Sequence, residues 1–303
     1  MPSASLPLSP SSPLRLWEGY AYGFLGVLIF SLTLPMTRVV VAELDPLLVS
    51  LGRAAIAAFP AMLLLALTRS RRPVRAEWAG IALAALGVVV GWPLASTIAM
   101  TTVPASHGAV VNGLLPLSTA AWAAWLSGER PSRAFWGWAV AGALLVAAFA
   151  LREGEGMPQA GDAWLTLAVV LGGLGYAEGA RVARTLGGWR TICWVLVFSL
   201  PFLILPVGWM AAHTDLRADA GTWLAFGYLA LFSMFAGFFA WYHGLAVGGI
   251  ARVGQVQLLQ PFLTVLAAGA LFGEHVDAWT LGFALAVLLI IACGRRAAVG
   301  GRT

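Results

Sequence analysis

Lysine is absent from this 303-residue chain, so all 18 basic residues are arginine. The protein therefore has no Walker-A lysine for nucleotide phosphates, and no lysine that could form a Schiff base or act as a nucleophile. Cysteine is scarce as well, because Cys193 and Cys293 are the only two and they lack the spacing of a metal or redox motif. We expect no cofactor, no metal site and no disulfide framework.

Charged residues make up only 10% of the chain, whereas 60% of residues are hydrophobic and the mean hydropathy is +0.86. A soluble domain carries about 25% charged and about 45 to 50% apolar residues. The composition predicts an all-α integral membrane protein with the lipid bilayer as its surroundings. The formal charge of +5 comes from arginines clustered in short loops beside apolar runs, which indicates contact with anionic headgroups and no nucleic-acid partner.

A spanning helix needs about 20 mostly apolar residues to cross a hydrocarbon core of about 30 Å. Ten segments meet this requirement: 19–37, 46–68, 78–97, 105–126, 135–151, 162–183, 191–212, 221–243, 251–272 and 278–293. The connections are short, so we expect one integral membrane domain. Residues 1–16 are rich in serine and proline and have no continuous apolar core, which predicts a disordered cytoplasmic tail and no cleaved signal peptide.

Arginine is distributed unevenly between the two sides of this ten-helix arrangement. Fourteen arginines fall on the side of the N-terminus, three fall on the other side, and Arg53 lies inside the second segment. Cytoplasmic loops are enriched in basic residues. The bias predicts that both termini are cytoplasmic.

The chain contains an internal repeat. At an offset of 145 the matching residues are Asn112 and Gln257, Pro116 and Pro261, Thr119 and Thr264, and Gly128-Glu129 and Gly273-Glu274. Near an offset of 146, Phe30 matches Tyr176 and Arg38 matches Arg184. We predict two five-helix repeats, 17–151 and 152–303. Because five is odd, the second repeat is inverted in the membrane, an architecture typical of transporters that expose a central site alternately to each face.

The segments LLPLSTAAWAAWLSGER and LLQPFLTVLAAGALFGEH share a proline followed by Gly-Glu at the same distance. This pattern, with the ten segments, the duplication and Arg53, resembles the EamA-type members of the drug/metabolite transporter superfamily along nearly the whole chain. The resemblance implies a bacterial-type cytoplasmic (inner) membrane protein that exports small metabolites. Within the superfamily, the YddG-type exporters of aromatic and other amino acids are the leading comparison. A duplicated chain can form the carrier alone, so we expect a monomer.

Three prolines predict helix kinks or gates near a substrate. Proline displaces the carbonyl four residues earlier, so Pro35 frees that of Ser31, Pro116 that of Asn112 and Pro261 that of Gln257. Free carbonyls can accept from an ammonium group, and the Asn112 and Gln257 amides can donate to a carboxylate, as an amino acid requires. The alternative is that the prolines only bend the helices and the amides join them, at about 0.6 kcal/mol each.

Further candidates for substrate contact come from the first, third, sixth and eighth segments: Phe30, Ser31, Thr33, Trp92, Tyr176 and Tyr242. The hydroxyls could instead bond their own helix, and the aromatic rings could face lipid. Arg53 could bind a substrate carboxylate, reach the headgroups, or clamp the carbonyls of a broken helix. Glu129 and Glu274 are predicted to cap or pair at helix ends, and Glu178 is spaced for an ion pair with Arg181.

The most favoured function is export of neutral or aromatic amino acids by alternating access through a central cavity. The alternative is a broad-specificity exporter of drugs or other metabolites, with or without proton coupling. A membrane enzyme is disfavoured, because the sequence has neither H-E-x-x-H nor G-x-S-x-G.

Overall fold

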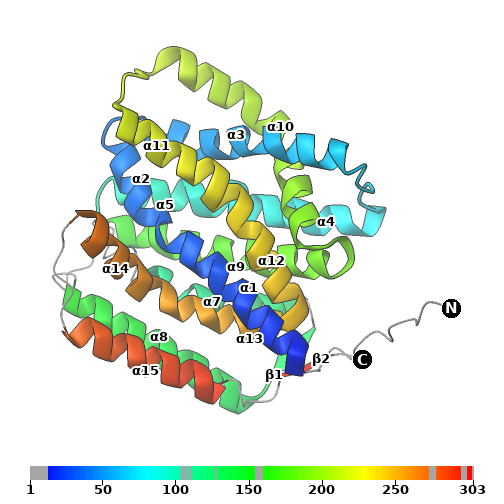
Figure 1. Cartoon of the computed structure of the whole chain (residues 1–303), viewed down its shortest axis with the longest axis vertical. Helices are drawn as coiled ribbons and strands as arrows, with labels where there is room; N and C mark the ends of the chain where they lie inside the picture. The colour runs from blue at the N-terminus through cyan, green and yellow to red at the C-terminus, as the bar shows by residue number, and fades with distance from the viewer. Residues whose placement is uncertain are drawn as a thin grey trace.

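The computed structural model describes residues 13–103, 108, 111–126, 128–153, 160–272, 278–294 and 299–301. Its elements are helices apart from one short two-stranded sheet (Figure 1). Six helical stretches of the described chain are long and apolar enough to cross a membrane: Leu14–Val41, Pro46–Leu67, Arg75–Met100, Gly161–Leu186, Gly188–His213 and Ala220–Gly248. The expectation of an all-α, multi-pass membrane protein is thus confirmed.

The first half of the chain contains α1 (Pro13–Ser31), α2 (Thr33–Val41), α3 (Pro46–Leu67), α4 (Arg75–Ala84), η1 (Ala85–Gly91), α5 (Trp92–Met100), α7 (Leu115–Leu126), β1 (Glu129–Pro131) and α8 (Arg133–Glu153). Helix α1 begins at Pro13, and residues 1–12 of the predicted tail lie outside the described residues. Asp45 ends the loop before α3 by accepting hydrogen bonds from the N–H groups of Leu47 and Leu48. This cap, with Pro46 at the first position, fixes where α3 starts.

The second half contains α9 (Ala160–Leu186), α10 (Gly188–His213), α11 (Ala220–Tyr228), η2 (Leu229–Ala236), α12 (Gly237–Gly248), α13 (Ile250–Gly254), η3 (Gln255–Leu259), α14 (Gln260–Phe272), α15 (Ala278–Gly294) and β2 (Val299–Gly301). Four of the ten predicted segments are not among the six stretches above. They are occupied by α7, by α8, by α13 to α14, and by α15. That these four also cross the membrane stays a prediction.

The same local distortion occurs once in each half. Both η1 and η2 are π-helical, and the offset of 145 places η1 on residues 230–236, within η2. A π-helical turn holds an extra residue and is frequent at functional sites. Val88 of η1 and Ser233 of η2 correspond at this offset, and both line the cavity described below. The repeat predicted from α7 and α14 therefore extends to a backbone feature that the sequence did not reveal.

The first and sixth predicted segments run in opposite directions. Helix α1 begins beside the end of α12, where Glu18 binds His243. Helix α13, which follows α12, begins at Ile250, and the Ile250 N–H donates to Glu129. Glu129 also binds Arg184 at the end of α9. At the opposite end, Arg38 of α2 donates to the carbonyls of Met100 and Val103. Helix α9 begins there, since Leu165 packs with Leu34 and Met100.

Two helix pairs flank this arrangement. Helix α3 packs against α10, and at the other edge of the molecule α8 packs against α15 (Figure 1). Each pair joins corresponding helices of the two halves. The strands β1 and β2 are antiparallel, with Glu129 opposite Gly301. They hold the described C-terminal residues beside the end of α7, close to the start of α1 (Figure 1).

Glycine allows helices to cross closely at two places. A Cβ atom added to Gly87 would lie 2.5 Å from the Cα of Gly175, where η1 crosses α9. A Cβ atom added to Gly19 would lie 2.7 Å from the Cα of Gly248, where α1 crosses α12. Both distances are too short for any side chain. Glycine at these positions therefore allows the helix backbones to approach each other closely.

Candidate functional site

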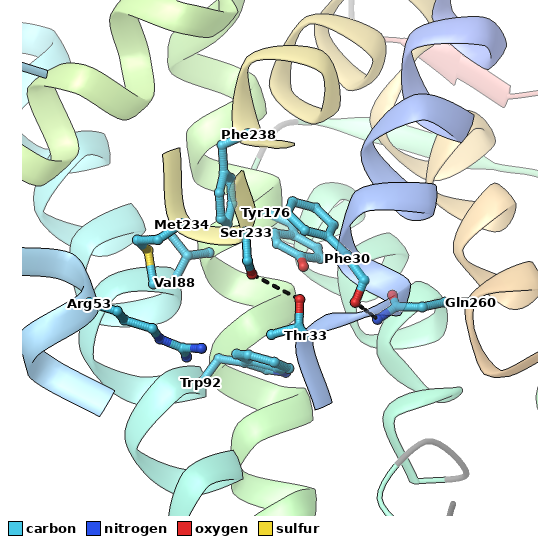
Figure 2. A pocket seen from close by; sticks show the side chains of 10 residues that line it. All are labelled: Phe30, Thr33, Arg53, Val88, Trp92, Tyr176, Ser233, Met234, Phe238 and Gln260. Carbon is cyan, nitrogen blue, oxygen red and sulfur yellow. Dashed lines mark hydrogen bonds between the residues drawn. The ribbon is translucent and has the colours of Figure 1, made fainter. Parts of the chain in front are cut away.

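A cavity lies among helices of both halves, near the middle of their length (Figure 2). Its volume is about 20 Å³, which is room for about one water molecule. The lining residues are Phe30, Thr33, Arg53, Val88, Trp92, Tyr176, Ser233, Met234, Phe238 and Gln260. Five of the predicted site residues are therefore brought together: Phe30, Thr33, Arg53, Trp92 and Tyr176. In this conformation the cavity is narrow, so any substrate larger than water requires rotation of the lining side chains.

Arg53 is the charged residue of the cavity. Helix α3 brings it inward, and Figure 2 shows its guanidinium pointing toward Trp92 and Thr33. The residue is only 1% exposed, and its Nε and Nη2 have no hydrogen-bond partner. The guanidinium lies 5.7 Å from the centre of the Trp92 ring, close enough for a cation–π contact. In this conformation Arg53 neither reaches the surface nor bonds a described carbonyl, and its role stays a prediction.

Aromatic rings form much of the cavity wall. Phe30 and Tyr176, which match in the repeat, stack with their ring centres 6.3 Å apart and their planes 11° apart. Phe238 lies 5.0 Å from Phe30, centre to centre. Trp92 is oriented by Asn112, whose Oδ1 accepts a hydrogen bond of 3.1 Å from the indole Nε1. Asn112 thus lies behind Trp92 and does not line the cavity.

Two separate sets of polar contacts join the two halves at the cavity. The Thr33 and Ser233 hydroxyls are 2.8 Å apart (Figure 2). Gln257 donates from Nε2 to Oε1 of Gln260, and Gln260 donates from Nε2 to the carbonyl of Phe30, at 3.1 and 3.2 Å. Gln257 also lies beside the Tyr176 hydroxyl, while its own Oε1 is buried without a partner. Gln257 therefore supports the wall through Gln260 and Tyr176 and is not itself a lining residue.

The three prolines mark interruptions of helices. The break between α1 and α2 precedes Pro35, and the freed carbonyl of Ser31 accepts a hydrogen bond of 2.8 Å from Thr264. A turn at residues 113–114 precedes Pro116, and η3 is 3₁₀-helical before Pro261. The carbonyl of Gln257 is not free as predicted, because the tighter 3₁₀ turn lets it accept from the N–H of Gln260.

Two predicted site residues have other roles. The Ser31 hydroxyl donates to the carbonyl of Leu28 in its own helix at 2.6 Å. Tyr242 is fully buried, and its hydroxyl donates to the carbonyl of Gly175 at 3.1 Å. Neither side chain lines the cavity. Ser31 follows the general tendency of helix hydroxyls to bond the preceding turn, and Tyr242 joins α12 to α9.

Five lining residues are not among those predicted from the sequence: Val88, Ser233, Met234, Phe238 and Gln260. Gln260 had a signal, since it is a polar residue in an apolar run and lies one helical turn beyond Gln257. Ser233 and Phe238 had none, because a single serine or phenylalanine in a membrane helix is common. Within the described residues there is no group of three metal-ligating side chains.

Two acidic residues outside the cavity are paired. Glu129 accepts from the N–H groups of Ile250 and Ala251, each at 2.9 Å, and from Arg184. It thereby caps α13 from the end of the first half, as the predicted capping role requires; Glu274 lies outside the described residues. Glu178 is buried and forms an ion pair of 2.7 Å with Arg181, as its spacing predicts.

The duplicated helical fold and a central cavity that holds a buried arginine define a transporter-like membrane protein. The EamA-like transporter family matches residues 17–152 and again residues 159–293. The chain belongs to this family, and the domain is therefore duplicated within it.

A curated relative is an uncharacterized transporter, YdeK, of Bacillus subtilis (strain 168). It is 44% identical over 280 residues, which cover 92% of this chain and 97% of that protein. A solved crystal structure has the same fold, with a TM-score of 0.72 at 20% identity, covering 92% of this chain and 96% of that one.

Proposed function

We propose that this chain is a secondary transporter that exports small metabolites bearing a carboxylate, amino acids first, from the bacterial cytoplasm across the inner membrane. It works by alternating access to the cavity between two inverted repeats of five membrane-crossing helices, with both termini cytoplasmic. The opposite directions of α1 and α9 and the distribution of arginine support this topology. Family membership supports transport but does not identify the substrate.

The observation that carries the carboxylate is the Arg53 guanidinium. Its Nε and Nη2 are buried donors without partners, and a buried charge without a partner is costly. A carboxylate can accept both N–H groups at once, in the paired geometry that guanidinium favours. A substrate carboxylate at Arg53 would satisfy the one lining charge that the protein itself leaves without a hydrogen bond.

The remaining lining residues favour an uncharged or aromatic side chain on the substrate. Phe30, Tyr176 and Phe238 offer ring faces and edges. The hydroxyl oxygens of Thr33 and Ser233 share one hydrogen bond and keep lone pairs that can accept from an ammonium group. Among the alternative substrates, drugs and other metabolites, those that are cationic are disfavoured because they would approach the Arg53 charge without a counter-charge.

The test is efflux of labelled phenylalanine, methionine, threonine and glutamate from liposomes that contain the purified protein, with no ion gradient. We expect flux of the neutral amino acids, and at least about tenfold slower flux with Arg53→Gln, since hydrogen bonds to charged groups contribute about 1.5 to 3 kcal/mol. Arg217→Gln, at an exposed loop position, is the matched control. Absence of flux for all four, in protein shown to be folded and oriented, would overturn the proposal.

A further inference from the structure

The charge balance of the cavity bears on how the carrier returns after releasing its substrate. Arg53 is 1% exposed, and no hydrogen bond or ion pair joins it to another described residue. Glu178, two residues beyond the lining residue Tyr176 on α9, is already bound by Arg181, with distances of 2.7 to 3.2 Å. The described protein therefore supplies no counter-charge to Arg53.

A carrier that alternates between two openings passes through a closed intermediate. When the cavity opens to either side, water can solvate the guanidinium. When it closes, water is excluded, and an unpaired guanidinium must lose its solvation without compensation. A bound carboxylate compensates for this loss, because it pairs with the guanidinium in the same closed cavity.

The other lining groups cannot replace that carboxylate. Thr33 and Ser233 bond each other, and the Gln260 amide is engaged by Gln257 and the Phe30 carbonyl. Trp92 offers only a ring face, 5.7 Å from the Arg53 Cζ. The cation–π contact contributes less than a paired carboxylate does in a buried site.

We infer that the protein is an exchanger: Arg53 makes the empty carrier reorient slowly, so that outward movement of one carboxylate substrate is coupled to inward movement of another. This inference rests on the proposed function and adds the mode of transport. It also assigns Arg53 a second role, which is to suppress leakage of the empty carrier in addition to binding substrate.

Liposomes with the full-length protein, loaded with labelled phenylalanine, provide the test. Efflux is measured into carboxylate-free buffer, into unlabelled phenylalanine, and into 2-phenylethylamine, which has the same ring and ammonium group but no carboxylate. We expect external phenylalanine to accelerate efflux at least about tenfold, a change of about 1.4 kcal/mol in the barrier, and the amine to leave it unchanged. Equal efflux into buffer and phenylalanine, or equal acceleration by the amine, would overturn the inference.

Two variants separate the charge from the fold. Arg53→Lys keeps a cation and is expected to retain acceleration by external phenylalanine. Arg53→Gln is expected to abolish the acceleration. Phenylalanine efflux through this variant should be slower than through the wild-type protein and should have the same rate into buffer and into external phenylalanine. Acceleration that persists undiminished in Arg53→Gln would also overturn the inference. Absence of phenylalanine efflux from the wild-type protein under all three conditions would overturn the proposed function itself, a different result from uncoupled efflux.

Discussion

Helices α3 and α10 are corresponding members of the two halves, and they pack against each other. Pro60 and Pro206 lie inside them at the offset of 146, and the same offset places Arg53 on Ser199. Ser199 is also buried, but its hydroxyl donates to the carbonyl of Val195 in its own helix. At this position the first half has Arg53, a charged side chain with unpaired hydrogen-bond donors, whereas the second half has Ser199, a neutral side chain whose hydroxyl is already hydrogen-bonded.

The two halves thus share the same scaffold, whereas the chemistry that each brings to the cavity has diverged. Each half contributes one π-helical stretch and one ring of the stacked pair Phe30 and Tyr176. Each half also has a helix interrupted before a proline, Pro116 in the first and Pro261 in the second. A backbone distortion can be kept in both repeats because packing maintains it. A charge need occur only once, because one carboxylate needs one guanidinium.

Removal of the Arg53 charge should have the greatest effect on the protein. Arg53→Met should raise the stability of the folded protein by about 1 to 4 kcal/mol while abolishing transport, because it removes a buried charge that has no partner. Ser199→Ala should change both properties little. Thermal unfolding in detergent, together with phenylalanine efflux, measures the two effects. A fall in melting temperature for Arg53→Met would instead identify Arg53 as a structural clamp.

The next effect concerns the close helix crossings. Gly87→Ala places a Cβ atom against the backbone of Gly175, so the helices must separate, at an expected cost of about 1 to 3 kcal/mol. Gly208→Ala is the matched control, since nothing lies within 4 Å of a Cβ atom there. The melting temperature in detergent should fall for the first variant only. An equal response of both variants would show that the crossing tolerates a side chain.

The contact between the halves at Glu129 should be weaker but measurable. Glu129→Gln keeps the shape but loses the charge that binds Arg184 and caps α13, which we expect to cost about 1 to 2 kcal/mol. Glu18→Gln is the control, because Glu18 pairs with His243 at an exposed position, where ion pairs contribute about 0 to 1 kcal/mol. Urea unfolding in mild detergent should separate the two variants, and equal destabilisation would contradict the capping role.

Substitution of the two matched amides, Asn112 and Gln257, should have the weakest effects. Asn112→Ala releases the Trp92 indole, and Gln257→Ala releases Gln260, so each loses one hydrogen bond of about 0.5 to 1.5 kcal/mol. Both should raise the KM for phenylalanine efflux by about 2- to 10-fold. Trp92→Phe should reproduce the Asn112→Ala effect, and combining the two should add little. Additive losses would mean that Asn112 contacts the substrate directly.

The sequence alone was sufficient to identify the chain as a membrane protein, because a chain with 60% hydrophobic and 10% charged residues is too apolar for a soluble domain. The duplication could also be read, since the proline and Gly-Glu pattern recurs at a constant offset. The pairing of Glu178 with Arg181 followed from local spacing, whereas the sequence placed Glu129 at a helix end without naming its distant partners, Ile250 and Arg184. Such features depend on neighbours within a few turns or on a repeated pattern.

Only the tertiary structure decided which of the candidate residues share one cavity. Ser31 and Thr33 are two residues apart, yet the first hydroxyl bonds its own helix and the second meets Ser233, 200 residues away. Arg53 could be placed inside a membrane helix from the sequence, but whether it reached lipid, a carbonyl or a cavity depended on every helix packed around it. Local periodicity fixes a side chain's position on its helix, whereas its partners are fixed by the packing of helices distant in the chain.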